Sequence, residues 1–287
     1  MPNDTAGRAT DAIQTIGAAI SIYNAVEIYV CAFSTFKRYN TLYCWSVLTC
    51  ASGLLMQSIS WTLVSYNCCV GNGLLVALAT SSLSWWAMVT GFSVTLYSRL
   101  TIIDVPHVYC TRIKMLIIFN FVFCHLLTTM FTYGSRLIGS DFWVTGYSII
   151  EKIQVTMFLI QEVILSSMYI IHVGTGYGDE MRAVQKATLY VNILVLILDL
   201  VVVVVEYLDL FTIQVALKLA IYSIKIKLEF LILRQLTDAS DSYRKSTALA
   251  AKCNCHQTEA PVKSLKAIGM KSNALPEALS SASAVVS

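Results

Sequence analysis

The chain has 287 residues, of which 56% are hydrophobic and 13% are charged, and its mean hydropathy is +0.67. A soluble domain carries about 25% charged residues, so this composition excludes an ordinary water-soluble globule. The net charge of +3 is too small to favour binding to nucleic acid.

Apolar blocks recur along the chain at lengths that suit membrane spans. An α-helix needs about 20 apolar residues to cross a bilayer. We therefore predict an all-α polytopic membrane protein: a seven-transmembrane helix bundle over 15–235, between a polar N-terminal segment (1–14) and a disordered cytosolic tail (236–287). The polar start lacks the basic head of a cleavable signal peptide, so the first span should remain as an anchor. The predicted spans are 15–36, 42–65, 74–98, 113–133, 148–173, 188–209 and 212–235.

The basic residues outside these spans are distributed asymmetrically. Fourteen Lys and Arg residues fall in the first, third and fifth loops and in the tail, whereas Arg8 and Arg136 alone fall on the other side. Cytosolic loops carry an excess of Lys and Arg. We therefore expect a cytosolic C-terminus and a lumenal or extracellular N-terminus.

The first and third spans contain unusual polar or aromatic groups. Glu27 in "YNAVEIYV" places a carboxylate near the middle of the first span, with Asn24 one turn before it. The third span, "SSLSWWAMVTGFSVTLYSRL", carries Trp85 and Trp86 and no carboxylate. A charge at the bilayer centre costs about 2.5–3.5 kcal/mol on insertion scales, so Glu27 should face the bundle interior and find a partner.

The last three spans each carry a polar stripe when the residues are placed at 100° intervals. These stripes contain more polar residues than helix packing in a membrane requires. In the fifth span the stripe comprises Glu151, Gln154, Phe158, Gln161, Glu162, Tyr169 and His172; in the sixth, Asn192, Asp199 and Glu206; and in the seventh, Gln214, Lys218, Tyr222, Lys225 and Glu229.

The short turn between the sixth and seventh spans makes these spans antiparallel neighbours. Counting inward from the turn, Glu206 reaches the depth of Lys218, and Asp199 reaches the depth of Lys225. Two structural ion pairs would account for these charges without any chemistry. Lys227 points the other way, where its side chain would extend to the cytosolic interface.

This pairing leaves Glu27, Glu162 and Glu229 without a cation, and a buried carboxyl without a cation should stay protonated. These three acids and Asp199 are the candidate catalytic residues, because a protonated acid in a cavity is a proton donor. The candidate substrate-binding rings are Trp85, Trp86, Tyr169 and Tyr222, whose faces would stabilise a carbocation. The alternative for each ring is packing in the core or at the membrane interface.

The cysteines give little support for a metal site or a disulfide. Cys253, Cys255 and His256 in "KCNCH" supply at most three ligands without a second cluster, so no metal and no cofactor are predicted. Cys68 and Cys69 lie in a short loop on the predicted non-cytosolic side, and no disulfide partner is evident. The glycine-rich "GTGYGDE" (174–180) follows a membrane span rather than a strand, which argues against nucleotide binding.

Four segments carry a resemblance to known proteins: "WWAMVTGFSVTLYSRL" (85–100), "TYGS" (132–135), "YSIIEKIQVTMFLIQE" (147–162) and "YSIKIKLEFLIL" (222–233). They resemble a group of small fungal seven-span integral membrane proteins. In size, span count and acid placement the chain also looks like the membrane-bound terpene cyclases of fungal meroterpenoid biosynthesis, of the ascofuranone and macrophorin type. That resemblance implies protonation of an epoxide or olefin and cyclisation of a prenyl chain, without metal or nucleotide.

Three functions remain open at this point. The first is a terpene cyclase of the endoplasmic reticulum, which takes a lipophilic prenylated substrate from the bilayer. The second is a seven-transmembrane receptor-like sensor at the fungal cell surface, for which the acids are packing pairs or a ligand anchor. The third is a proton-coupled carrier, although the odd span count and the lack of an internal repeat argue against it.

Overall fold

The computed structural model describes residues 2–35, 40–66, 68, 71–102, 105–173, 182–209, 213–232 and 234. The predictions for the tail (236–287), Cys69, Cys253, Cys255, His256 and segment 174–180 therefore lie outside the described residues. Within the described part the chain is all-helical. Its helices are α1 (Pro2–Thr35), α2 (Leu42–Ser65), α3 (Asn72–Ile102), α4 (His107–Leu137), α5 (Asp141–Val173), α6 (Arg182–Tyr207) and a last one over residues 213–232, here called the 213–232 helix.

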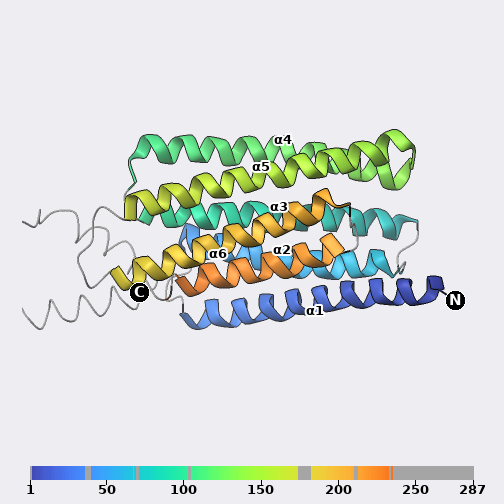
Figure 1. Cartoon of the computed structure of the whole chain (residues 1–287), viewed down its shortest axis with the longest axis horizontal. Coiled ribbons are helices and arrows are strands. Elements are labelled where there is room, and N and C mark those ends of the chain that lie inside the picture. Colours follow the sequence, from blue (N-terminus) through green and yellow to red (C-terminus); the bar gives the residue numbers. More distant parts are fainter. Residues whose placement is uncertain are drawn as a thin grey trace, which may run out of the picture.

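The helices lie side by side in one elongated bundle (Figure 1). The N-terminus and the turn between α4 and α5 lie at the same end of the bundle, which we call the N-terminal end. Six helices are long and apolar enough to cross a membrane, so by length and composition this is an integral membrane protein. These candidate spans are Asp11–Thr35, Leu42–Ser65, Asn72–Thr101, His107–Leu137, Asp141–His172 and Lys186–Tyr207.

Several helices extend beyond the predicted spans. Helix α1 begins at Pro2, within the segment predicted as a polar N-terminal stretch, and α3 continues to Ile102 instead of ending at residue 98. Hydropathy locates the apolar stretch that fits a bilayer, whereas the backbone hydrogen bonds of a helix continue past it. The extension of α3 matters for the site, because it brings Arg99 from a predicted loop into a buried helical position.

Helices α2 and α3 approach each other closely at a glycine. A Cβ atom on Gly53 would lie 2.6 Å from the backbone nitrogen of Met88 and 2.7 Å from the carbonyl oxygen of Ser84. Small residues allow such close contact between membrane helices. This contact holds α3 against α2. On its other sides α3 packs against α4 and α5.

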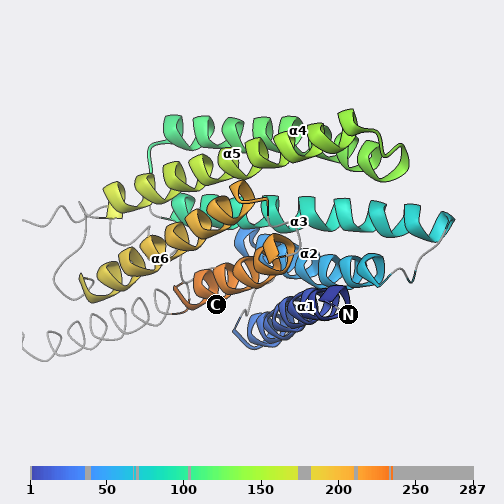
Figure 2. The ribbon, with the colours of Figure 1, turned by 45° about the vertical axis from the view of Figure 1, so that its right-hand side comes forward.

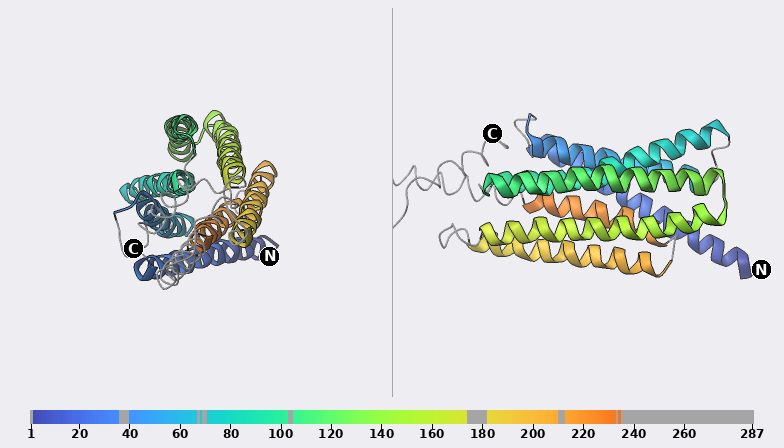
Figure 3. Two further views of the ribbon diagram at one scale, coloured as in Figure 1. Left: turned by 90° about the vertical axis from the view of Figure 1, so that its left-hand side faces the viewer. Right: turned by 90° about the horizontal axis from the view of Figure 1, so that it is seen from above.

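The 213–232 helix, orange in Figures 1 and 2, makes side-chain contacts with several other helices of the bundle. Seen end-on in Figure 3, it lies between α1 and α6. It binds α1 through Asn24 Nδ2, which donates to Ser223 Oγ at 2.9 Å, and its ion pairs reach α3, α5 and α6. The predicted stripes of the last two spans are confirmed as buried, at Asn192, Asp199, Glu206, Gln214, Lys218, Tyr222, Lys225 and Glu229.

Candidate functional site

Lys225 lies at the centre of a fully buried group of three charges, here called the Lys225 triad. Its Nζ donates to both carboxylate oxygens of Glu162, at 2.8 and 2.7 Å, and to Oδ1 of Asp199 at 2.6 Å. The rings of Phe92 and Tyr222 lie 4.3 and 4.6 Å from the same ammonium. The predicted pair of Asp199 and Lys225 is thus present, with Glu162 as an additional partner.

Lys218 forms a second group, the Lys218 triad, seven residues earlier on the same helix. Its Nζ lies 2.6 Å from Glu151 Oε1 on α5 and 2.6 Å from Glu206 Oε2 on α6. Gln214 Nε2 donates to Glu206 Oε1 at 3.4 Å. The predicted pair of Glu206 and Lys218 is confirmed, and each triad joins the same three helices.

Glu229 is paired with Arg99, which lies one residue beyond the predicted third span of 74–98. Arg99 Nη1 donates to Glu229 Oε2 at 2.7 Å, and its Nη2 donates to Asn192 Oδ1 at 2.8 Å. The guanidinium also lies 4.1 Å from the centre of the Tyr169 ring. Both charged side chains are buried. The expectation that Glu229 lacks a cation is therefore wrong.

Glu27 is also paired, and so is Lys227, which was expected to extend towards the interface. Lys227 Nζ donates to Glu27 Oε2 at 2.6 Å, and both side chains remain 35% exposed. The expectation of three unaccompanied acids thus fails for Glu27, Glu162 and Glu229 alike. Each failure has its own cause. The predicted limit of the third span excluded Arg99, one acid per lysine was assumed for Lys225, and Lys227 was expected to point away from the bundle.

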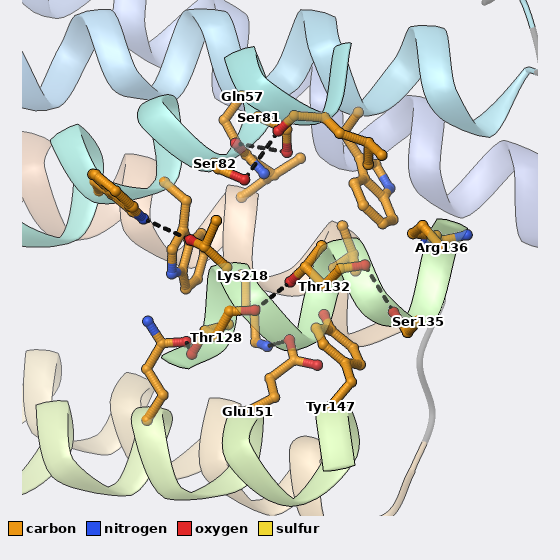
Figure 4. Close-up of a pocket in the computed structure, with 18 residues that line it drawn as sticks. Gln57, Ser81, Ser82, Thr128, Thr132, Ser135, Arg136, Tyr147, Glu151 and Lys218 are labelled. Atoms are coloured by element: carbon orange, nitrogen blue, oxygen red, sulfur yellow. Dashed lines mark hydrogen bonds and ion pairs between the residues drawn. The ribbon is translucent and has the colours of Figure 1, made fainter. Parts of the chain in front are cut away.

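A cavity opens among α2, α3, α4, α5 and the 213–232 helix towards the N-terminal end (Figure 4). It comprises about 820 Å³ of empty space, part of it open to the surroundings. Hydroxyl and amide side chains make up much of the lining, together with Lys218, Glu151 and Arg136. The polar uncharged members are Gln57, Ser81, Ser82, Thr128, Thr129, Thr132, Ser135, Tyr147 and Gln154.

A second cavity adjoins the first and is more open, since its roughly 840 Å³ of empty space includes space outside the protein. Ser135, Arg136, Tyr147 and Glu151 line both cavities. The remaining lining residues of the second cavity are Val144, Ser148, Glu206, Asp209 and Gln214. The Lys218 triad therefore forms a shared wall between the two spaces.

Asp209 lies beyond the last residue of α6, at the rim of the second cavity. Its Oδ1 is 2.7 Å from Lys152 Nζ and accepts a 3.3 Å hydrogen bond from Ser148. The hydrogen bond from Lys152 holds the pKa of the Asp209 carboxyl below its ordinary value. This pair ties α5 to the chain that follows α6.

The four rings predicted to bind substrate divide between the first cavity and the interior of the bundle. Trp85 and Trp86 line the first cavity, and Trp61 does so as well. Tyr169 and Tyr222 line neither cavity: Tyr169 stacks on Arg99, and Tyr222 contacts Lys225 and the edge of Trp85. The predicted acids Glu27, Glu162, Asp199 and Glu229 are likewise absent from both linings among the described residues.

A network of neutral groups supports the cavity wall between α3, α4 and α5. Gln154 accepts a 2.9 Å hydrogen bond from Thr128 through Oε1, and its Nε2 lies 3.3 Å from His125 Nδ1. The other ring nitrogen of His125 is 3.1 Å from the Thr90 hydroxyl. His125 itself is buried and does not line the first cavity, so it contacts the cavity wall through Gln154. Within the described residues, no three His, Cys, Asp or Glu side chains form a group that could hold a metal ion.

A family model described as "Domain of unknown function (DUF7703)" matches residues 6–259. The chain belongs to the DUF7703 family. No curated protein and no solved structure matches it. The family description names no reaction or ligand for a DUF7703 chain.

Sequence reasoning missed two features of the DUF7703 site. Glu151 was placed on the polar stripe of its span but was not chosen as a candidate, although it is the acid that lines both cavities. Arg136 was treated as a topology signal, whereas it lines both cavities from the last turn of α4. Both residues lie near the short turn between α4 and α5, and this nearness in sequence could have indicated that they share a site.

Proposed function

We propose that this protein is a receptor-like membrane sensor that binds a small amphipathic molecule in the cavities at the N-terminal end. The observation that carries the proposal is the shared cavity wall. Glu151 and Lys218 face the first cavity and also tie α5 and α6 to the 213–232 helix. A ligand that contacts this wall contacts the same groups that hold three helices together.

The lining favours recognition over carbocation chemistry. Serine and threonine hydroxyls donate and accept hydrogen bonds, so they fix the orientation of a polar ligand. The same hydroxyls are nucleophiles that would capture a carbocation beside them. Every acid proposed as a proton donor is held by a Lys or Arg side chain, and an ion-paired carboxylate is a poor acid.

The 213–232 helix offers a route for a signal along the bundle. Lys218 lies at the cavity, and Lys225 and Glu229 follow at seven and eleven residues further along the same helix. Glu229 binds Arg99, near the C-terminal end of α3. A ligand that binds one arrangement of Lys218 more tightly would bias the position of the whole helix.

The proposed orientation follows from the basic residues. The 213–232 helix would be the seventh span, the cavities would open to the lumen or the exterior, and the basic loops would face the cytosol. A sensor of external molecules requires this arrangement, with the cell surface as its location.

Native mass spectrometry of the protein purified in lipid nanodiscs tests the proposal. We expect a bound small molecule that is lost in Ser82→Trp, because a tryptophan at this lining position fills the first cavity. Leu83→Trp is the matched control, since Leu83 is the next residue of α3 and is 60% exposed. Adding the released compound back should slow hydrogen exchange at residues 222–232. An equal loss in both variants, or no bound molecule in the wild type, contradicts a cavity ligand.

A terpene cyclase acting on a prenylated substrate is the second candidate, supported by the three tryptophans and Glu151 in one cavity. Their ring faces would stabilise a cation, and the two carboxyls of the Lys218 triad could share a proton. Membranes containing the protein should then convert an epoxyfarnesylated phenol into a cyclic isomer, separable by chromatography. Glu151→Gln should abolish that product. An unchanged substrate with the wild-type protein rules out this activity on that substrate class.

A further inference from the structure

The two triads have the same composition but different surroundings. Each places two carboxyl groups around one lysine ammonium. The Lys225 triad is enclosed, and none of its members lines either cavity. In the Lys218 triad, every member lines a cavity: Lys218 the first, Glu206 the second and Glu151 both.

The Lys218 triad has more negative than positive groups, and the cavities beside it could hold a compensating cation. With all three groups ionised it carries one net negative charge, and its residues are at least 90% buried. A buried charge without a counter-ion is costly. No lining residue of either cavity belongs to the Lys225 triad, whereas the Lys218 triad borders both cavities and so has space beside it for a monocation.

The tryptophans that line the first cavity, Trp85 and Trp86, also favour a bound cation. The centre of the Trp85 ring lies 5.7 Å from Lys218 Nζ, so the ring already interacts with the ammonium of the triad at the cavity wall. Trp86 continues the lining, and the faces of aromatic rings attract ammonium ions. A cation beside Glu151 would therefore have carboxylates on one side and rings on the other.

The remaining charges around the cavities do not reverse this balance. Three acids and two bases line the two cavities together: Glu151, Glu206, Asp209, Lys218 and Arg136. Asp209 is bound by Lys152 at the rim. Arg136 is exposed in the last turn of α4, with its guanidinium 5.9 Å from the Trp61 ring centre, so its charge is less enclosed than the charges of the buried triad.

We propose that the two cavities bind a small organic ammonium ion, whose charge completes the Lys218 triad and whose apolar body lies against Trp85 and Trp86. This inference rests on the proposed function and adds the chemical class of its ligand. The ammonium would lie beside Glu151 and Glu206, where the negative charge is greatest, and would donate hydrogen bonds to their carboxylates.

Three probes of matched shape test the inference by calorimetric titration of the full chain in nanodiscs. They are 2-phenylethylammonium, neutral 2-phenylethanol and anionic 3-phenylpropanoate. We expect the ammonium to bind at least tenfold more tightly than the alcohol and the acid to bind most weakly. Glu206→Gln should reduce that preference at least tenfold. Asp141→Asn should leave it unchanged, because Asp141 is exposed at the start of α5 and lines neither cavity.

Different results separate the inference from the function on which it rests. If the alcohol or the acid binds as tightly as the ammonium, and Ser82→Trp abolishes that binding, the cavity takes a ligand but the charge argument is wrong. If no probe binds and the purified protein carries no small molecule, both the inference and the proposed function are overturned. The comparison of probes on the wild-type protein decides the question even if Glu206→Gln does not fold.

Discussion

Replacing Lys225 by methionine should be among the most damaging single changes in this protein. The Lys225 side chain is fully buried and holds Glu162 and Asp199 through contacts of 2.6–2.8 Å. Methionine fills a similar volume but leaves two buried carboxyls without their cation. Removing one partner of a buried ion pair costs about 3–5 kcal/mol, and we expect the upper half of this range because two acids lose their partner.

The loss can be measured by the unfolding of the protein in mixed micelles, and matched variants separate charge from packing. Lys227→Met removes a lysine from a pair whose two side chains are 35% exposed and leaves one carboxyl, Glu27, without its cation instead of two, so it should cost less than Lys225→Met. Combining Lys225→Met with Glu162→Gln and Asp199→Asn should recover most of the stability, because no buried charge then remains. The reasoning fails if Lys225→Met costs no more than Lys227→Met, or if the triple variant is as unstable as the single one.

Three further changes give distinct outcomes. Arg99→Lys should lower the unfolding free energy by about 1–3 kcal/mol, because a lysine cannot bridge Glu229 and the α6 amide as a guanidinium does; equal stability would contradict this. Gly53→Ala should destabilise by about 1–3 kcal/mol, since its Cβ would meet backbone atoms of α3 at 2.6 and 2.7 Å; a thermal scan showing no loss would mean that α2 and α3 separate easily. Lys152 lowers the pKa of Asp209, so their pair should stabilise the folded protein fully above the ordinary Asp pKa of about 3.9. This stabilisation should be lost as the pH falls through the lowered pKa. The difference between wild type and Asp209→Asn should therefore disappear at the lowest pH, and a difference that grows on acidification would refute the sign.

Helical periodicity was enough to predict which faces of the last helices are buried. The spacing of Asn192, Asp199 and Glu206 repeats every seven residues, so these side chains stay on one face. Counting from a short turn also placed Glu206 beside Lys218 and Asp199 beside Lys225. Both results depend on local geometry and on a connection too short to allow another arrangement.

Contacts between helices that are distant in the sequence could not be predicted in this way. The pair of Glu27 and Lys227 joins α1 to the 213–232 helix across 200 residues, and no local pattern says that these helices are neighbours. Arg99 was missed because the hydropathy limit of the span ended one residue before it. The hydroxyl-rich cavity has no sequence signature either, because its lining comes from five helices.

The four charges on the 213–232 helix have a consequence for how the protein is made. Each of Lys218, Lys225, Lys227 and Glu229 would cost about 2.5–3.5 kcal/mol at the bilayer centre, and this helix is not among the six candidate spans that the described residues contain. As a seventh span it would insert poorly by itself, whereas α3, α5 and α6 carry the counter-charges that lower this cost. Membrane integration of the last helix should therefore wait until the earlier helices have assembled, and a chain that lacks one of these partners should be left with an uninserted segment for quality control to recognise.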